Sequence, residues 1–265
     1  MSEPVVKIER RGAAVWLILN RPERQNAVNW DVFPLLEDGI TRAQADPDIR
    51  AIVLTGTGDK YFCVGGELGF DEARSKTGLA PDYLTHPLVG LFKTVEACGL
   101  PLIARVNGHC MAPGLNLLAM CDLAVAADHA LIAAPEAKVG LFPMLALGYL
   151  QRLVPRRHLL QMILTGEPLK AGEACAIGLL NRVVPAAELD TAVEAVVARL
   201  VANSPDAIRR GKHAFRAMDD MSLEETFAHG VAAVSLLLLT EDFREGVRAF
   251  AEKRSPAWPQ RKTAL

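Results

Sequence analysis

Short apolar runs alternate with amphipathic segments over most of the chain. Two β-rich runs, residues 5–9 and 13–19, are joined through Gly12 and predict a hairpin. Three further apolar runs predict buried strands, at residues 51–55, 101–106 and 123–126. Segments of helical periodicity separate these strands, so the pattern predicts an α/β fold.

Helices are expected between these strands at residues 30–45, 83–97 and 114–120. Pro34 falls early in the first of them, so that helix begins late or is kinked. The third helix is apolar on every side except at Asn116, which predicts that it lies in the interior.

From Gln151 onward the pattern is almost entirely helical. Helices are expected at residues 156–164, 171–177, 187–201, 205–218, 223–239 and 241–253. Ser204 before Pro205, and Ser222 three residues before Glu225, are typical helix N-caps. This helical C-terminal third indicates a subdomain for assembly or a lid.

Composition and charge exclude several classes of partner. The chain has 265 residues, 51% of them hydrophobic, and a formal net charge of −2, which favours neither nucleic acid nor an anionic membrane. Its five cysteines lack C-x-x-C spacing and are expected to be reduced core thiols. No apolar targeting segment begins the chain, and the longest apolar runs, residues 141–150 and 231–239, are too short for a bilayer. We therefore expect a cytoplasmic protein.

Two loops before helices carry candidate chemistry. Residues 62–68 include the pair Gly65 and Gly66, which lets the backbone direct N–H groups at a ligand; an ordinary turn is the alternative. Residues 107–114 lead into the buried helix, whose N-terminus favours negative charge. One backbone amide from each loop would make an oxyanion hole. Pro113 stands in the second loop, however, and has no N–H to donate.

Glu136 is the candidate acid or base. It lies in the apolar segment 134–143, where proline and glycine fix the backbone. Partial burial raises the pKa of a carboxyl group, which suits general acid–base catalysis. A surface glutamate paired with Lys138 is the alternative interpretation.

The remaining polar residues indicate no metal site. His86 and His109 have no cysteine or carboxylate at ligand spacing and are interpreted as structural histidines, and Asp122 is expected to cap or pair locally. The chain contains no H-E-x-x-H, G-x-S-x-G or P-loop motif, which argues against zinc hydrolases, serine esterases and P-loop enzymes.

Taken together, these segments resemble the enoyl-CoA hydratase/isomerase (crotonase) superfamily over nearly the whole chain. The motifs that carry the resemblance are Asn20-Arg21-Pro22, Asn26-Ala27, Phe62-Cys63-Val64-Gly65-Gly66, Pro101-Leu102-Ile103-Ala104-Arg105-Val106-Asn107-Gly108, Cys121-Asp122, Pro135-Glu136, Gly140, Pro143, Leu164-Thr165-Gly166, Ala171-Gly172-Glu173-Ala174, Gly178-Leu179-Leu180-Asn181, Asp242, Glu245-Gly246 and Ala249-Phe250-Ala251-Glu252-Lys253-Arg254.

The resemblance implies a spiral of ββα units over residues 1–200, with an acyl-CoA site, and a helical oligomerisation region over residues 201–265. It implies a homotrimer or a dimer of trimers. No cofactor or metal is expected, because coenzyme A is part of the substrate.

The resemblance also assigns site residues. One amide that holds the thioester oxygen corresponds to Gly66, and the other corresponds to Pro113; the next amide, at Gly114, would substitute if the turn rotates. One acid/base glutamate of the hydratases corresponds to Glu136, and its partner corresponds to Asn116. Residues expected along coenzyme A are Arg24 near the phosphates, Ala27, Val64, Gly65, and Lys253, which would reach a neighbouring subunit's ligand.

We therefore expect an acyl-CoA enzyme, in first place an enoyl-CoA hydratase. A Δ3,Δ2-enoyl-CoA isomerase that uses Glu136 alone is one alternative, and an acyl-CoA-binding homologue with little turnover is another, favoured by Pro113 and Asn116. Thioester hydrolysis or decarboxylation is a third. Residues 61–84 and 142–150 are expected to line the pocket, and residues 144–147 indicate an apolar acyl tunnel, although core packing explains them as well.

Overall fold

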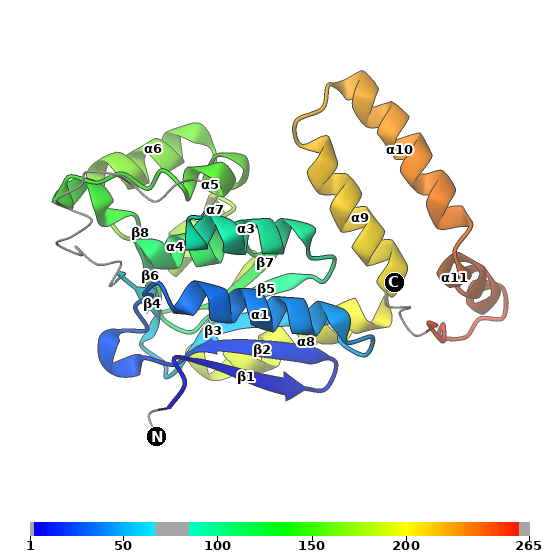
Figure 1. Cartoon of the computed structure of the whole chain (residues 1–265), viewed down its shortest axis with the longest axis horizontal. Coiled ribbons are helices and arrows are strands. Elements are labelled where there is room, and N and C mark those ends of the chain that lie inside the picture. The colour runs from blue at the N-terminus through cyan, green and yellow to red at the C-terminus, as the bar shows by residue number, and fades with distance from the viewer. Residues whose placement is uncertain (1–2, 67–84, 260–265) are drawn as a thin grey trace.

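The computed structural model describes residues 3–66 and 85–259 and is built around a six-stranded sheet (Figure 1). Its strands follow the order β1 (Val6–Arg11), β2 (Ala14–Leu19), β3 (Ala51–Gly56), β5 (Leu102–Val106), β7 (Leu123–Ala127) and β10 (Arg182–Val184). Strand β1 pairs antiparallel with β2, and the other neighbours are parallel. The predicted hairpin and three predicted strands are confirmed.

A second sheet contains four short strands, in the order β4 (Tyr61–Val64), β6 (His109–Met111), β8 (Leu131–Ala133) and β9 (Leu169–Lys170). Three of them directly follow a long strand: β4 follows β3, β6 follows β5, and β8 follows β7. A helix then completes two of these units, α3 (Pro87–Ala97) after β4 and α4 (Pro113–Ala119) after β6. The predicted α/β fold of ββα units is therefore confirmed, although strands of two to four residues are too short for their pattern to be read in the sequence.

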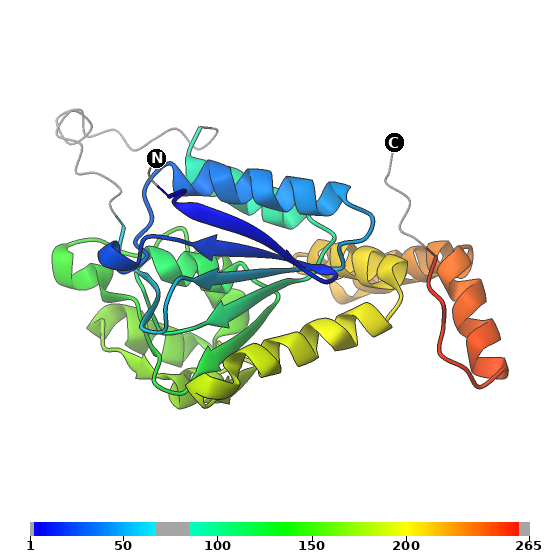
Figure 2. The ribbon, with the colours of Figure 1, turned by 90° about the horizontal axis from the view of Figure 1, so that it is seen from below.

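Helices cover both faces of the large sheet. Helices α1 (Val32–Ala45) and α3 pack side by side over one face, and α8 (Leu189–Ala202) covers the other (Figure 2). On the α8 side, Trp16 and Ile103 of the sheet form one apolar cluster with Val193 of the helix. This burial against the sheet fixes the strand ends from which the site loops emerge.

The starts of α1 and α3 differ from the prediction, as does that of α8, which begins at Leu189 rather than at residue 187. Helix α1 begins at Val32 rather than at Trp30, since residues 30 and 31 form a turn in which the Val32 N–H donates to the Asn29 side chain at 3.2 Å. Helix α3 begins at Pro87, since proline supplies the fixed φ of a first helical residue. Residues 83 and 84, where that helix was expected to start, lie outside the described residues.

The other α-helices lie in the second half of the chain. They are α5 (Leu147–Leu153), α6 (Arg156–Thr165), α7 (Ala171–Ala176), α9 (Pro205–Met218), α10 (Leu223–Leu238) and α11 (Glu241–Ala251), with short 3-10 helices at Pro22–Arg24, Pro135–Val139 and Ala186–Glu188. Helix α5 lies in an apolar run whose pattern does not predict it. The predicted caps are confirmed, since Ser204 Oγ accepts from the Ala207 N–H at 3.0 Å and Ser222 forms a capping box with Glu225.

Helices α9 to α11 leave an apolar surface exposed. Helix α10 contains no buried residue and stands away from the two sheets (Figure 1). The large apolar side chains exposed here, which we call the C-terminal apolar surface, are Phe215, Leu223, Phe227, Val231, Val234, Leu236, Leu238, Leu239, Phe243, Val247 and Phe250. Between α10 and α11 lies a groove of about 490 Å³.

All five cysteines are free thiols, and four of them are buried, which confirms the prediction of core thiols. Among the described residues, no single helix is long and apolar enough to cross a membrane, while α10 and α11 reach that length and apolarity together across a 71° bend.

Candidate functional site

One large cavity, of about 770 Å³, brings most of the predicted site residues together. Its described walls come from the start of α1 and α3, the β6–α4 turn, and the segment after β8. The residues that line it are Phe33, Gly66, His86, Leu88, Ala112, Pro113, Asn116, Pro135, Glu136, Lys138, Val139, Leu141, Phe142, Pro143, Met144 and Leu145. A volume of this size falls in the range of small-ligand sites, roughly 300–1,000 Å³.

Glu136 presents a carboxyl group to this cavity. It lies in the 3-10 helix Pro135–Val139, which ends at Gly140 with a φ of 77°, a conformation that suits glycine. Its Oε2 is buried and has no hydrogen-bond partner within the described part of the chain. Desolvation raises the pKa of the Glu136 carboxyl group. The described residues show no ion pair with Lys138, so the structure does not support the surface-pair interpretation.

The β4 and β6 ends bring the two predicted loops side by side. These strands are parallel, with Val64 opposite Met111, and the Gly65 N–H donates to the Met111 carbonyl at 3.4 Å. Gly66 and Pro113 therefore lie at adjacent strand ends and line the same cavity. The rest of the first loop, residues 67 and 68, lies outside the described residues.

The β6–α4 turn has an unusual backbone. Ala112 adopts a φ of 52° and a ψ of −122°, which costs a non-glycine residue conformational energy. Pro113 is the first residue of α4 and carries no N–H. A Cβ on Gly114 would stand 2.2 Å from the Cys63 carbonyl oxygen, so only glycine permits this contact between α4 and β4.

Asn116 is the fourth residue of α4 and is 8% exposed. It lines the cavity, and its Oδ1 is buried with no hydrogen-bond partner among the described residues. Positions three apart on a helix share a face, so Asn116 and Pro113 lie on the same side of α4. The sequence predicted this grouping of Pro113, Asn116, Glu136 and Gly66, and the structure brings all four to one cavity.

The residues expected along coenzyme A lie in two separate parts of the structure. The Val64 N–H donates to the Gln25 carbonyl at 3.0 Å, so the segment that holds Arg24 and Ala27 lies beside Val64 and Gly65. Lys253 follows α11, which lies on the far side of the molecule from β4 (Figure 1). Within one chain, the structure therefore does not bring Lys253 to the other four.

The apolar wall after Glu136 is accessible. Met144 and Leu145 line the cavity and are 68% and 38% exposed, so core packing does not account for them, whereas Ala146 is 1% exposed and does pack in the core. The other predicted wall, residues 67–84, lies outside the described residues.

His86 lies at the site, although the sequence indicated a structural role. It lines the cavity directly before α3, and its ring meets Trp30 edge-on at 5.4 Å between centroids. The sequence did show that His86 directly precedes an apolar helix with proline at its first position, which was the available signal that it lies at a helix start. His109, in contrast, has a structural setting, since its Nδ1 accepts from the Leu131 N–H at 3.2 Å.

Asp122 does not pair locally as predicted. Its Oδ2 accepts hydrogen bonds from the Leu102 N–H at 2.7 Å and from Lys212 Nζ at 2.5 Å, and its Oδ1 accepts from Arg216 at 3.2 Å. Two of these donors belong to α9, so Asp122 joins the end of the buried helix to the C-terminal helices. The prediction was wrong because the partners lie far along the chain.

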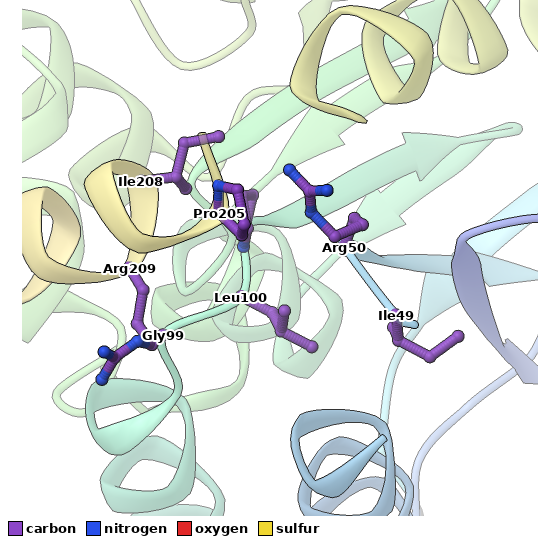
Figure 3. Close-up of a pocket in the computed structure, with 8 residues that line it drawn as sticks. Ile49, Arg50, Gly99, Leu100, Pro205, Ile208 and Arg209 are labelled. Atoms are coloured by element: carbon purple, nitrogen blue, oxygen red, sulfur yellow. The ribbon is translucent and has the colours of Figure 1, made fainter. Parts of the chain in front are cut away.

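A second depression lies where α9 meets the sheet, between Arg50, Leu100, Pro205 and Ile208 (Figure 3). Its volume is about 10 Å³, which is room for about one water molecule. It is therefore a packing gap at the base of α9 rather than a ligand site.

Comparison with known proteins agrees with this geometry. Residues 9–261 match the family model described as "Enoyl-CoA hydratase/isomerase". The mitochondrial enoyl-CoA hydratase domain-containing protein 3 of Danio rerio is 33% identical over 97% of this chain and 88% of its own. The crotonyl-CoA hydratase of Syntrophomonas wolfei is 31% identical over 96% of this chain and 97% of its own.

A solved structure is similar as well. The crystal structure of an enoyl-CoA hydratase from Mycobacterium smegmatis matches with a TM-score of 0.89 and 34% identity, and the alignment covers 97% of this chain and 99% of that one.

Proposed function

Because the chain belongs to the enoyl-CoA hydratase/isomerase family, we propose that it is an enoyl-CoA hydratase, which adds water to a 2-enoyl-CoA, with Glu136 as its proton-transfer group. The observation that carries this proposal is the Glu136 residue, which lines the cavity and whose buried Oε2 has no hydrogen-bond partner among the described residues. A carboxyl group in that setting is ready to exchange a proton with a ligand.

One carboxyl group is enough for a balanced hydration. The carboxylate of Glu136 takes a proton from water while the water oxygen bonds to C3, and the C2–C3 double-bond electrons move to form a thioester enolate. Glu136 then returns the proton to C2, which restores the thioester carbonyl. The Gly66 amide stabilises the enolate oxygen as a hydrogen-bond donor.

Asn116 favours Δ3,Δ2-enoyl-CoA isomerisation as the second candidate. An amide cannot exchange a proton as a second carboxyl group would, whereas isomerisation needs only one such group. Glu136 would take a proton from C2 of a 3-enoyl thioester and deliver it to C4, as the double bond moves to C2–C3. Thioester binding without turnover is the remaining alternative, because Pro113 removes one donor.

The coenzyme A part is proposed to lie along Arg24, Ala27, Val64 and Gly65. We also propose that copies of the chain form a homotrimer through the C-terminal apolar surface, since many exposed apolar side chains on three consecutive helices mark an interface. In such an assembly Lys253 would reach coenzyme A bound by a neighbouring copy.

Two substrates assayed side by side test the proposed reaction. The purified protein is expected to hydrate crotonyl-CoA, which is followed by the loss of enoyl absorbance. Conversion of a 3-enoyl-CoA without hydration would replace the hydratase with the isomerase. Binding of a thioester with neither reaction would mean that the protein is an acyl-CoA-binding protein and not an enzyme of either kind. Failure to bind either thioester would overturn the proposed function.

A further inference from the structure

We propose that the Asn116 side-chain amide is the second oxyanion donor of this site, in place of the backbone N–H that Pro113 lacks. The proposal rests on the proposed acyl-CoA function and adds a catalytic residue to it. Asn116 would donate from Nδ2 to the thioester oxygen, opposite the N–H of Gly66.

Asn116 lies where its side chain can contact a ligand in the cavity. It is nine-tenths buried and lines the cavity, and its side chain makes no hydrogen bond with another described residue. The buried polar atom of that side chain is Oδ1, which leaves Nδ2 as the polar atom toward the cavity. Burying a carboxamide oxygen without a partner costs about 1–3 kcal/mol, so packing alone does not account for an asparagine at this position. The carboxamide has two N–H donors and one acceptor oxygen.

The direction of side chains on an α-helix brings the Asn116 amide toward Pro113. Each Cα–Cβ bond on an α-helix tilts toward the N-terminus, so the side chain of a residue covers the turn before it. The side chain of Asn116 therefore leans over the first turn of α4, where Pro113 stands three residues earlier on the same face. The amide group is thus brought toward the position from which a backbone N–H is missing.

Gly114 is a weaker substitute for that donor. It is buried, and its Cα faces the Cys63 carbonyl, to which an added Cβ would approach within 2.2 Å. It is not among the described residues that line the cavity, whereas Pro113 and Asn116 both are. Rotating the turn to expose its amide would disturb the packing of α4 on β4.

Pro113 and Asn116, which both differ from the residues expected in a hydratase, would then compensate for each other. A proline alone would cost one oxyanion donor, a loss of about 10²–10³ in rate. An amide side chain on the same helix face would replace the lost donor, since asparagine side chains serve as donors in some oxyanion holes. Substitutions at the two positions are therefore expected to act non-additively, because either position can supply the same hydrogen bond.

The test is a double-mutant cycle on Pro113→Gly and Asn116→Leu, with thermal unfolding measured for each variant. Asn116→Leu is expected to lower kcat/KM by about 10²–10³, and Pro113→Gly in that background to restore at least about tenfold. The gain in kcat/KM from Pro113→Gly should be smaller in the presence of Asn116 than in the Asn116→Leu background, which is the non-additivity that the cycle measures. Asn116→Ala replaces Asn116→Leu if the leucine variant does not fold.

A spectroscopic readout separates this inference from the proposed function. The carbonyl stretch of bound crotonyl-CoA, measured by isotope-edited infrared spectroscopy, should shift to lower frequency in the wild type, return toward its solution value in Asn116→Leu, and shift down again in the double variant. Binding with the same frequency in all variants overturns the role of Asn116 alone. Loss of hydration in Asn116→Leu with the frequency unchanged means that Asn116 holds water instead, which also overturns it. No binding of crotonyl-CoA by the wild type overturns the proposed function and this inference together.

Discussion

Asn116 and Glu136 face the same cavity from two different chain segments, and each keeps one buried oxygen without a hydrogen-bond donor among the described residues. Asn116 comes from α4, and Glu136 comes from the 3-10 helix after β8. Polar atoms left unsatisfied in a fold cost stability, so their grouping at one cavity indicates ligand chemistry rather than packing.

The pH dependence of turnover is expected to follow Glu136. Desolvation raises the pKa of its carboxyl group above the ordinary value of 4.5, and the carboxylate is the form that accepts a proton. As pH falls through that raised pKa, kcat/KM should therefore fall, with a midpoint above pH 4.5. A pH profile of kcat/KM checks this. A profile that stays flat down to pH 4.5, with the protein still folded, would argue against the carboxylate as the base.

Replacing Gly114 by alanine should destabilise the protein by about 1–3 kcal/mol, because the added Cβ would overlap the Cys63 carbonyl oxygen. Gly148 is the matched control, since a Cβ there meets nothing within 4 Å and the residue lies in α5. Gly148→Ala should be neutral or stabilising by up to about 1 kcal/mol. Denaturant unfolding measures both. Equal effects of the two substitutions would mean that α4 does not pack on β4 as described.

Lys212→Met should lower the free energy of unfolding by about 1–2 kcal/mol, because it removes one of the two cations that bind the carboxylate of Asp122 and leaves Arg216 as the other. Arg42→Met is the control, since the Arg42–Asp38 pair is exposed and such pairs contribute less than about 1 kcal/mol. Chemical denaturation compares the two variants. A loss in Lys212→Met no larger than that in Arg42→Met would show that this link between the core and α9 adds little stability.

The sequence predicted the long strands and the site because both depend on local patterns. Buried runs of five or six apolar residues identify a strand, and the motifs around Gly66, Pro113 and Glu136 place those residues at strand ends. Strands β8 and β9 could not be predicted in this way, since three and two residues show no period and are defined only by their pairing partners.

Long-range polar contacts were not predictable either. Asp122 and Lys212 are 90 residues apart, and nothing near Asp122 in the sequence indicates that its partner lies on α9. His86 joins the site only because α3 begins next to Trp30 in space. Its interpretation as structural followed from sequence spacing, which carries no information about a cavity whose walls come from several separate segments.

The most direct test of the account is the activity of Glu136→Gln, a substitution that keeps the side-chain shape but removes the exchangeable proton. Crotonyl-CoA hydration and 3-enoyl-CoA isomerisation are measured for this variant and the wild type, with thioester affinity measured by calorimetry. The rate of whichever reaction the wild type catalyses is expected to be about 10²–10⁴ lower in this variant, with the thioester affinity within a few-fold of that of the wild type. Retention of the wild-type rate by Glu136→Gln would contradict the assignment of proton transfer to this carboxyl group.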